Sequence, residues 1–355
     1  MQGQRAVTGD KGQVTGKVGL ESQVSSDPRP TTCDLRPPLV SVIMPTHNGE
    51  RTIEAAMQSV LAQEFRDLEL IVVDDSSSDG TAAIVQRIQA NDPRVLYIYQ
   101  HPRLGGPGPS RNRALREARG KYVAFLDGDD VWLLGKLEQQ VSWLEAHPET
   151  VLCFTQMYRD ADSEERMVCP SSDTRYNYLA EFRGNLIPVL TVVMRRDCLE
   201  AVGGFSEDLG MSEDYDLWLR LGQRYAFHFL SEPTAIYTVH ETSMSRNAVR
   251  MRRAWLKALR RVPINRRLGV TPWQKRRRLA QVRYDLARAL YERGACAEGA
   301  WECVKTVTMD PGVGGSVWNE RESKIWRRFQ PYRLLAQCLV GMVFGREKAD
   351  VKWRS

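Results

Sequence analysis

Acidic side chains gather at three points in the first 130 residues, each directly after a short apolar run. The first point is the segment 45–50, which ends in Glu50, the second begins with Asp74 and Asp75, and the third holds Asp127, Asp129 and Asp130. Carboxylates that lie close together raise one another's pKa unless a cation or a hydrogen-bond donor neutralises them. A single aspartate after a strand is often only a turn former. Three such clusters at successive strand ends instead predict a shared site that binds a cation.

The elements that carry these clusters alternate between strand and helix. Four apolar runs predict buried strands, at Leu39–Met44, Leu68–Asp74, Val95–Tyr99 and Tyr122–Leu126. Helical patterns lie between them at Arg51–Gln63, Thr81–Ala90, where Asp79 is the expected cap, and Ser110–Arg119. Further strands are expected at Val151–Met157, Leu190–Met194 and Tyr225–Leu230. This alternation predicts an α/β fold with a doubly wound sheet, in which ligands bind at the carboxyl ends of the strands.

Four stretches in order resemble one enzyme family. They are Val40–Thr81, Gly106–Asp130, Gly203–Leu221 and Tyr237–Ser245, and they resemble the motifs of family 2 glycosyltransferases over about 39–246. The resemblance implies a GT-A fold, a Rossmann-like and mostly parallel sheet sandwiched by helices. It also implies an inverting glycosyltransferase that moves a sugar from a nucleotide diphosphate donor, with UDP as the default nucleotide, to a hydroxyl of a glycan or lipid-linked acceptor.

The resemblance also implies roles for single residues. The nucleotide-sugar positions fall on Pro45, Thr46, Asn48, Glu50, Asp74, Asp75, Ser77, Arg111 and Asp127. Asp129, the second acidic position of the D-x-D motif, and His240 match metal neighbours, and Glu213-Asp214 matches the pair whose Asp is the catalytic base. Two prolines, Pro107 and Pro109, depart from the family pattern and are expected to stiffen the loop before Ser110.

The expected reaction needs a cation and a base. A divalent cation, Mn²⁺ or Mg²⁺, neutralises the charge of a leaving diphosphate as a Lewis acid. These ions favour oxygen ligands, and an imidazole such as that of His240 shifts the preference toward Mn²⁺. Asp214 is the predicted base for the acceptor hydroxyl, although it could also cap a helix at Tyr215–Gly222. A single base opposite the leaving group predicts inversion at the sugar carbon.

Two other functions are compatible with an acidic α/β domain. One is a catalytically inactive protein that binds a nucleotide sugar or an acidic polymer, and the intact Asp129 and Asp214 disfavour it. The other is a nucleotidyltransferase, which would place a Gly-rich loop with a basic residue after the first strand, where this chain has Pro45-Thr46-His47-Asn48. Nucleic-acid binding is not expected, because the basic residues form no recognised motif.

The remaining parts of the chain differ sharply in composition. Residues 1–38 predict a disordered tail, and residues 247–355 predict a helical basic region that includes a hairpin at Leu279–Arg293 and Gly299–Thr308. From Arg246 onward there are 26 Lys and Arg against 9 Asp and Glu. This excess fits either a solvated basic face or a peripheral contact with an anionic membrane, helped by the apolar Leu334–Phe344. Seven scattered cysteines without a C-x-x-C pair indicate a cytoplasmic protein.

Overall fold

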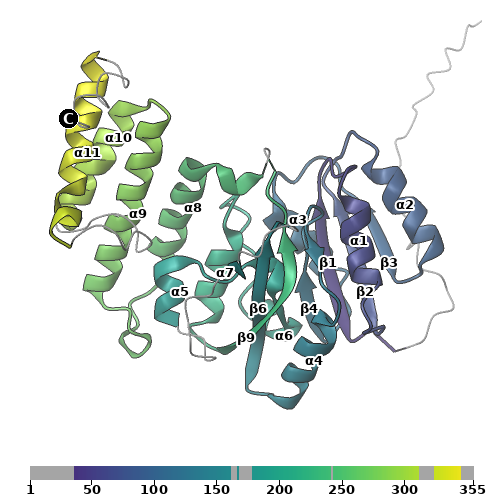
Figure 1. Ribbon diagram of the computed structural model, residues 1–355. Helices are drawn as coiled ribbons and strands as arrows, with labels where there is room; N and C mark the ends of the chain where they lie inside the picture. Colours follow the sequence, from purple (N-terminus) through teal and green to yellow (C-terminus); the bar gives the residue numbers. More distant parts are fainter. Residues whose placement is uncertain (1–35, 161–165, 168–177, 241–242, 312–323, 345–355) are drawn as a thin grey trace, which may run out of the picture. The chain divides into compact units, whose positions relative to one another are not determined.

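One sheet of nine strands runs through the residues that the computed structural model describes, which are 36–160, 166–167, 178–240, 243–311 and 324–344 (Figure 1). Its strand order is β3-β2-β1-β4-β8-β6-β9-β5, with β7 paired to β6. The strands are β1 Val40–Thr46, β2 Leu68–Asp74, β3 Val95–Tyr99, β4 Tyr122–Phe125, β5 Val131–Trp132, β6 Thr150–Arg159, β7 Arg166–Met167, β8 Val193–Arg195 and β9 Ala226–Tyr237. The sheet with helices on both faces confirms the predicted α/β fold class.

Strands β3, β2, β1 and β4 are parallel, as the apolar runs predict. Their register aligns the carboxyl ends, so that Thr46 of β1 lies opposite Asp74 of β2. Both faces of this half are buried: Val42 and Met44 pack into one apolar cluster, and Ile43 between them packs into the other. Strands buried on both faces need continuous apolar runs, which is why they were visible in the sequence.

The second half of the sheet mixes directions. β8 is antiparallel to both β4 and β6, whereas β6 and β9 are parallel. The strand predicted at Leu190–Met194 is wrong in its first half, because Val189–Thr191 forms a 3₁₀ turn, η1, before β8. In that turn the hydroxyl of Thr191 donates to the carbonyl of Pro188 at 2.7 Å. This bond and the fixed φ of proline favour the turn over an extended strand.

Helices cover both faces of the sheet. Residues of α1, α2 and α4 join one apolar cluster, and residues of α3, α6 and α7 join the other. The helices of this part are α1 Ile53–Leu61, α2 Thr81–Asn91, α3 Pro107–Leu115, α4 Lys136–Ala146, α5 Tyr178–Gly184, α6 Arg196–Glu200 and α7 Glu213–Leu221.

Two helix starts differ from the sequence-based prediction. α3 begins at Pro107 rather than Ser110, since a proline in the first turn loses no intrahelical hydrogen bond. The prolines therefore start a helix instead of stiffening a loop. At α2 the N-cap residue is Gly80. The predicted cap, Asp79, accepts a hydrogen bond from the backbone of Thr81 at 3.1 Å, which is a turn contact one residue earlier.

After β9 the described residues form helices and 3₁₀ turns, with one isolated β-bridge between Asn265 and Val270. These elements are η2 Met244–Arg246, α8 Ala248–Arg261, η3 Arg266–Leu268, α9 Pro272–Glu292, α10 Cys296–Met309 and α11 Lys324–Phe344. The predicted hairpin corresponds to α9 and α10, which share an apolar cluster with α11. Among the described residues, no helix combines the length and apolar character needed to cross a bilayer. The tail predicted at 1–38 lies outside the described residues except for its last three, of which Arg36 contacts Asp67 at 2.6 Å.

Candidate active site

The loops that follow β1 and β2 are hydrogen-bonded to each other at the carboxyl edge of the sheet. The carbonyl of Thr46 accepts from the backbone N–H of Asp75 at 2.9 Å. Asn48 adopts a left-handed backbone, with a φ of 53°. Its N–H donates to the hydroxyl of Ser77 at 2.8 Å, and its side-chain oxygen accepts from the N–H of Ser78 at 2.9 Å. Thr46, Asn48 and Ser77, three of the predicted nucleotide-site residues, therefore lie together.

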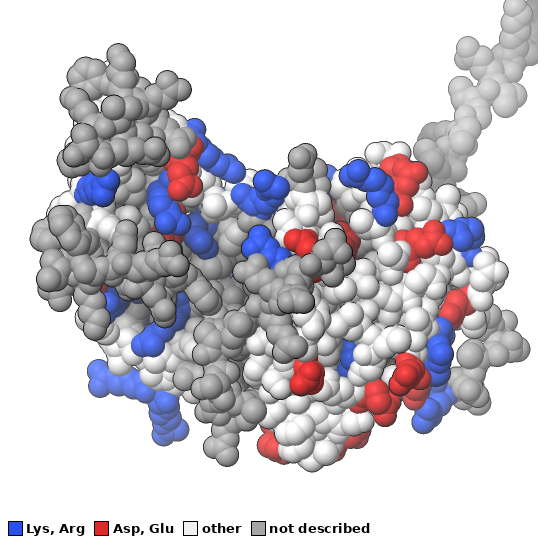
Figure 2. All heavy atoms as spheres, viewed as in Figure 1, with Lys and Arg blue, Asp and Glu red and all other residues white. Residues whose placement is uncertain are grey.

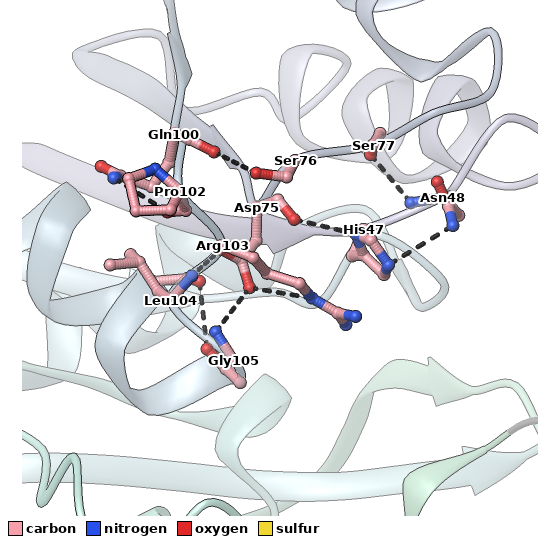
Figure 3. A network of polar contacts seen from close by, with 12 residues as sticks. His47, Asn48, Asp75, Ser76, Ser77, Gln100, Pro102, Arg103, Leu104 and Gly105 are labelled. Carbon is pink, nitrogen blue, oxygen red and sulfur yellow. Dashed lines mark hydrogen bonds and ion pairs between the residues drawn. The ribbon is translucent and has the colours of Figure 1, made fainter.

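Asp75 is the centre of the network drawn in Figure 3, and only 3% of the residue is exposed. Its two carboxylate oxygens accept from the backbone N–H groups of Leu104 and Gly105, at 2.5 Å and 3.1 Å. The guanidinium of Arg103 lies 3.6 Å away. The loop after β3 therefore contacts the carboxylate of Asp75, which the family resemblance assigns to nucleotide binding.

Other predicted nucleotide-site residues hold the loops in place. Asp74 is fully buried, and its carboxylate accepts from the N–H of Ser77 and from the hydroxyl of Tyr97, both at 2.8 Å. Because both of its oxygens accept hydrogen bonds from this region, Asp74 supports the loop. The carboxylate of Glu50 accepts from the N–H of Gly80 at 3.1 Å, at the start of α2. Pro45 accepts from the N–H of Gly128 at 3.2 Å, which joins β1 to the D-x-D segment.

Arg111 links residues that are about a hundred positions apart in the sequence. The guanidinium of this α3 residue donates to Asp127 of the D-x-D segment at 2.6 Å and also to the carboxylate of Glu213. The side chain of Arg111 is only 2% exposed. Burial alone would lower the pKa of Arg111. The negative charges of Asp127 and Glu213 outweigh this effect and raise the pKa. Through these two ion pairs, Arg111 connects Asp127 to Glu213 at the start of α7 and holds both in position.

Asp214 lies in the first turn of α7, next to Glu213. Burial raises the pKa of its carboxyl group to about 7, and the negative charge of Glu213 adds to the rise, whereas Arg111 opposes it. The carboxylate also accepts from the N–H of Tyr215 at 2.7 Å. The N-cap residue of α7 is Ser212, so Asp214 does not cap the helix. A carboxylate with a pKa near neutrality can accept a proton more readily than an ordinary aspartate.

Asp129 and His240 come together although 111 positions separate them in the sequence. The imidazole Nε2 of His240 lies 2.7 Å from a carboxylate oxygen of Asp129, and both side chains remain more than a third exposed. Burial and the charge of Asp127 raise the pKa of Asp129. The neighbouring Asp130 is buried, and its carboxylate accepts from the N–H of Thr238 at 2.9 Å, which ties the D-x-D segment to the strand that leads to His240.

This pair can contribute two ligands to a divalent cation. Within the described ranges, no group of three or more His, Cys, Asp or Glu side chains is arranged to hold a metal ion. Mg²⁺ and similar ions often bind through one or two carboxylates and take their other oxygens from substrate phosphates and water. The partly exposed Asp129 and His240 fit such a shared site, and they do not fit a site made by the protein alone.

Three residues outside the predicted set also shape this region. His47 bonds the carbonyl of Asp75 through Nδ1 at 2.9 Å. The indole of Trp255 on α8 donates to the hydroxyl of Ser212 at 3.1 Å, directly before the pair Glu213-Asp214. Glu181 on α5 is fully buried, and burial raises its pKa to about 8, with Asp214 contributing. His47 could have been noticed from its place after a strand, but no sequence signal pairs Trp255 or Glu181 with α7.

Comparisons with known proteins agree with this architecture. The model of the family described as glycosyl transferase family 2 matches residues 41–201. Structures of TarS from S. aureus in complex with UDP-GlcNAc and of the mannosyltransferase PcManGT from Pyrobaculum calidifontis with GDP-Man and Mn²⁺ are similar in fold. Their TM-scores are 0.58 and 0.54 and their identities 19% and 21%, over 89% and 87% of this chain and 91% and 88% of theirs.

Curated relatives are closer in sequence. WfgD of Escherichia coli, a UDP-Glc:alpha-D-GlcNAc-diphosphoundecaprenol beta-1,3-glucosyltransferase, is 38% identical over 52% of this chain and 69% of its own length. TuaG of Bacillus subtilis, a putative teichuronic acid biosynthesis glycosyltransferase, is 33% identical over 59% of this chain and 82% of its own length. With this similarity, the matching family model and the GT-A architecture, the chain belongs to the family 2 glycosyltransferases.

Proposed function

We propose that the protein transfers a sugar from a UDP-sugar to a hydroxyl group of a lipid-linked acceptor, with inversion at the sugar carbon. The observation that carries this proposal is the network in which Arg111 joins Asp127 to Glu213 and so places Asp214 beside the D-x-D segment. The choice of substrates is supported by WfgD and WfaP of Escherichia coli, each named as a UDP-Glc:alpha-D-GlcNAc-diphosphoundecaprenol beta-1,3-glucosyltransferase.

In this proposal Asp214 is the catalytic base. Its carboxylate accepts the proton of the acceptor hydroxyl as that oxygen forms a bond to the anomeric carbon and the bond to the nucleotide diphosphate breaks. The pKa of about 7 allows Asp214 to be ionised at neutral pH and still basic enough to take a proton. Attack opposite the leaving group in one displacement inverts the configuration.

The other residues bind and position. Asp75, Thr46 and Asn48 line the nucleotide side, and Arg111 with Glu213 keeps Asp127 and α7 in register. Asp129 and His240 would hold the divalent cation, Mn²⁺ or Mg²⁺, which when bound neutralises the charge on the leaving diphosphate. Because the chain belongs to a glycosyltransferase family, the nucleotidyltransferase interpretation is set aside.

A peripheral contact with the cytoplasmic face of the membrane fits a lipid-linked acceptor. α11 exposes several large apolar side chains to solvent, with Leu339 49%, Met342 46% and Val343 72% exposed. In Figure 2, Lys and Arg side chains are frequent where Figure 1 shows α8 to α10. Apolar side chains next to basic ones favour binding to anionic lipid surfaces. The double substitution Leu339→Ser with Val343→Ser is expected to reduce sedimentation with anionic vesicles, and unchanged sedimentation would reject this contact.

The transferase proposal is tested by a donor screen. Purified protein is heated with each nucleotide sugar, with and without Mn²⁺, because a ligand that binds only the folded state raises the melting temperature. A UDP-sugar is expected to stabilise the protein most, and the same donor is then used in a transfer assay with a diphosphate-linked GlcNAc acceptor. Retention of configuration in the product, or stabilisation by no nucleotide sugar, would refute the proposal.

A further inference from the structure

A basic hollow lies next to the loop that leads to α7, the helix that carries the proposed base. It has a volume of about 390 Å³ and is formed by the loop residue Leu209, the start of α8 and the end of α9. Four basic side chains line it, Arg250, Arg253, Lys257 and Arg293, and among the residues that the structure describes no acidic one does. A second hollow, of about 310 Å³ between α1 and α2, is lined by Asp92 as well as by Arg87 and Arg94. Basic side chains without an acidic one therefore distinguish the hollow at α8.

The basic side chains share one face of α8. Arg250, Arg253 and Lys257 follow one another at spacings of three and four residues, which places them in a row along a helix. Arg293, at the end of α9, adds a fourth charge from the opposite wall. The row begins at the N-terminus of α8, whose cap Asn247 also lines the hollow. The partial positive charge of a helix N-terminus adds to the attraction for an anion.

Two of the four charges have carboxylate partners outside the lining. Arg253 pairs with Glu298 at 2.7 Å, and Lys257 pairs with Asp208 at 2.6 Å. Arg250 instead donates to the carbonyl of Gly210 at 3.1 Å, and within the described part of the chain neither Arg250 nor Arg293 makes an ion pair. The hollow therefore keeps an excess of positive charge that an anion of two charges would neutralise.

The loop between this hollow and the base is held by the same residues. Gly210 has a φ of 65°, and a Cβ atom at this position would lie 3.0 Å from the guanidinium of Arg250. A glycine thus lets Arg250 pack against the loop backbone. Leu209 lines the hollow and Asp214 follows five residues later, so the chain between them spans at most about 18 Å. The chain between them therefore sets only an upper limit on the distance from the hollow to the base.

We propose that this basic hollow binds the diphosphate group of the acceptor, next to the loop that leads to Asp214. This inference rests on the proposed function. Charged hydrogen bonds to phosphate oxygens suit a guanidinium, which can donate two at once. The hollow also lies within the size range of small-ligand sites, which begins at about 300 Å³.

The test compares two acceptors in steady-state kinetics with the full chain. One is GlcNAc joined to a short prenyl chain through a diphosphate, and the other is an alkyl glycoside of GlcNAc without phosphate. Arg293→Gln is the main variant, because its side chain makes no ion pair with a described residue, and Arg250→Gln is the second. Arg260→Ala is the matched control, since this exposed arginine of α8 does not line the hollow.

For Arg293→Gln and Arg250→Gln we expect the KM of the diphosphate acceptor to rise about tenfold or more, the effect of losing a charge-assisted hydrogen bond. The KM of the donor and the kinetics of the alkyl glycoside should not change. The inference is overturned if the substitutions raise the KM of the diphosphate acceptor by no more than they raise the KM of the alkyl glycoside. It is also overturned if the variants lose only vesicle binding and keep the KM of the soluble acceptor, since the charges then serve a lipid surface.

Failure of the proposed function would look different. In that case the unsubstituted protein would transfer sugar to neither acceptor. Competition by inorganic pyrophosphate against the diphosphate acceptor, at saturating donor, provides a further check. Competitive inhibition that weakens in Arg293→Gln supports the hollow as the phosphate site, whereas inhibition of equal strength in both proteins contradicts it.

Discussion

Replacing Asp214 by Asn should lower kcat strongly and stabilise the fold, with both effects set by one carboxylate. The folded protein raises the pKa of this group from the ordinary 3.8 to about 7. Between these two values the folded state binds a proton that the unfolded state has lost, so the stability of the unsubstituted protein falls as pH rises. Because Asn does not titrate, the stability of the variant does not fall with pH through this group.

The size of the effect follows from the shift. Each pKa unit corresponds to about 1.4 kcal/mol, so the advantage of Asp214→Asn reaches at most about 4 kcal/mol above pH 7 and shrinks toward pH 4. Between pH 5 and pH 8 it should grow by about 3 kcal/mol. The buried Asp130 titrates in both proteins and cancels in the difference, whereas Glu181 titrates at a lower pKa in the variant because the charge of Asp214 helps to raise it. The loss of the base should lower kcat by about 10²–10⁴-fold.

The assay is denaturant unfolding of both proteins at pH 5 and pH 8, together with transfer kinetics at pH 8. The kcat of the unsubstituted enzyme should itself rise with pH and level off above about pH 7, because Asp214 must be ionised to act. A variant that is no more stable at pH 8 than at pH 5, relative to the unsubstituted protein, would refute the proton-binding state of the partly buried Asp214. A variant with full activity would refute its role as base.

Two further substitutions test the supports of the site. Arg111→Gln leaves Glu213 and Asp127 without their cation and should cost about 3–5 kcal/mol in unfolding free energy. The control Arg113→Gln in the same helix removes only a more exposed pair with Glu117, so its cost should stay below about 1 kcal/mol, and equal costs would contradict the network. Trp255→Phe removes the hydrogen bond to Ser212, worth about 1 kcal/mol, and should lower kcat about fivefold without changing the KM of the donor. A change in donor KM alone would argue against a role of Trp255 in positioning α7.

The first half of the fold was predictable from the sequence because its strands are buried on both faces. The predicted bounds of β2 and β3 coincide with the structure, since apolar runs such as Leu68–Asp74 end where the polar loops begin. β9 was harder to predict, because it continues to Tyr237 through Pro233, with shifts in register against β6. α8 was not predicted as a separate helix, since its many arginines hide the apolar positions Val249, Leu256 and Leu259.

The candidate site was predictable residue by residue but not as a network. The resemblance placed Arg111, Asp127 and Glu213 on the nucleotide or the reaction, whereas the structure pairs them with one another. Such pairs join α3, the D-x-D loop and α7 across about a hundred residues, and no local pattern encodes a contact of that kind. Asp74 shows the same limit, because a buried aspartate that holds a loop has the same sequence position as one that binds a ligand.

The central claim is that the carboxylate edge of the sheet holds a divalent cation against a nucleotide diphosphate. Isothermal titration of UDP into the protein, once with Mn²⁺ and once with a chelator, tests it most directly. The account predicts binding that is at least about tenfold tighter with Mn²⁺, a difference of about 1.4 kcal/mol, and predicts that Asp129→Ala removes this gain. Equal affinity under both conditions, or an undiminished gain in Asp129→Ala, would contradict it.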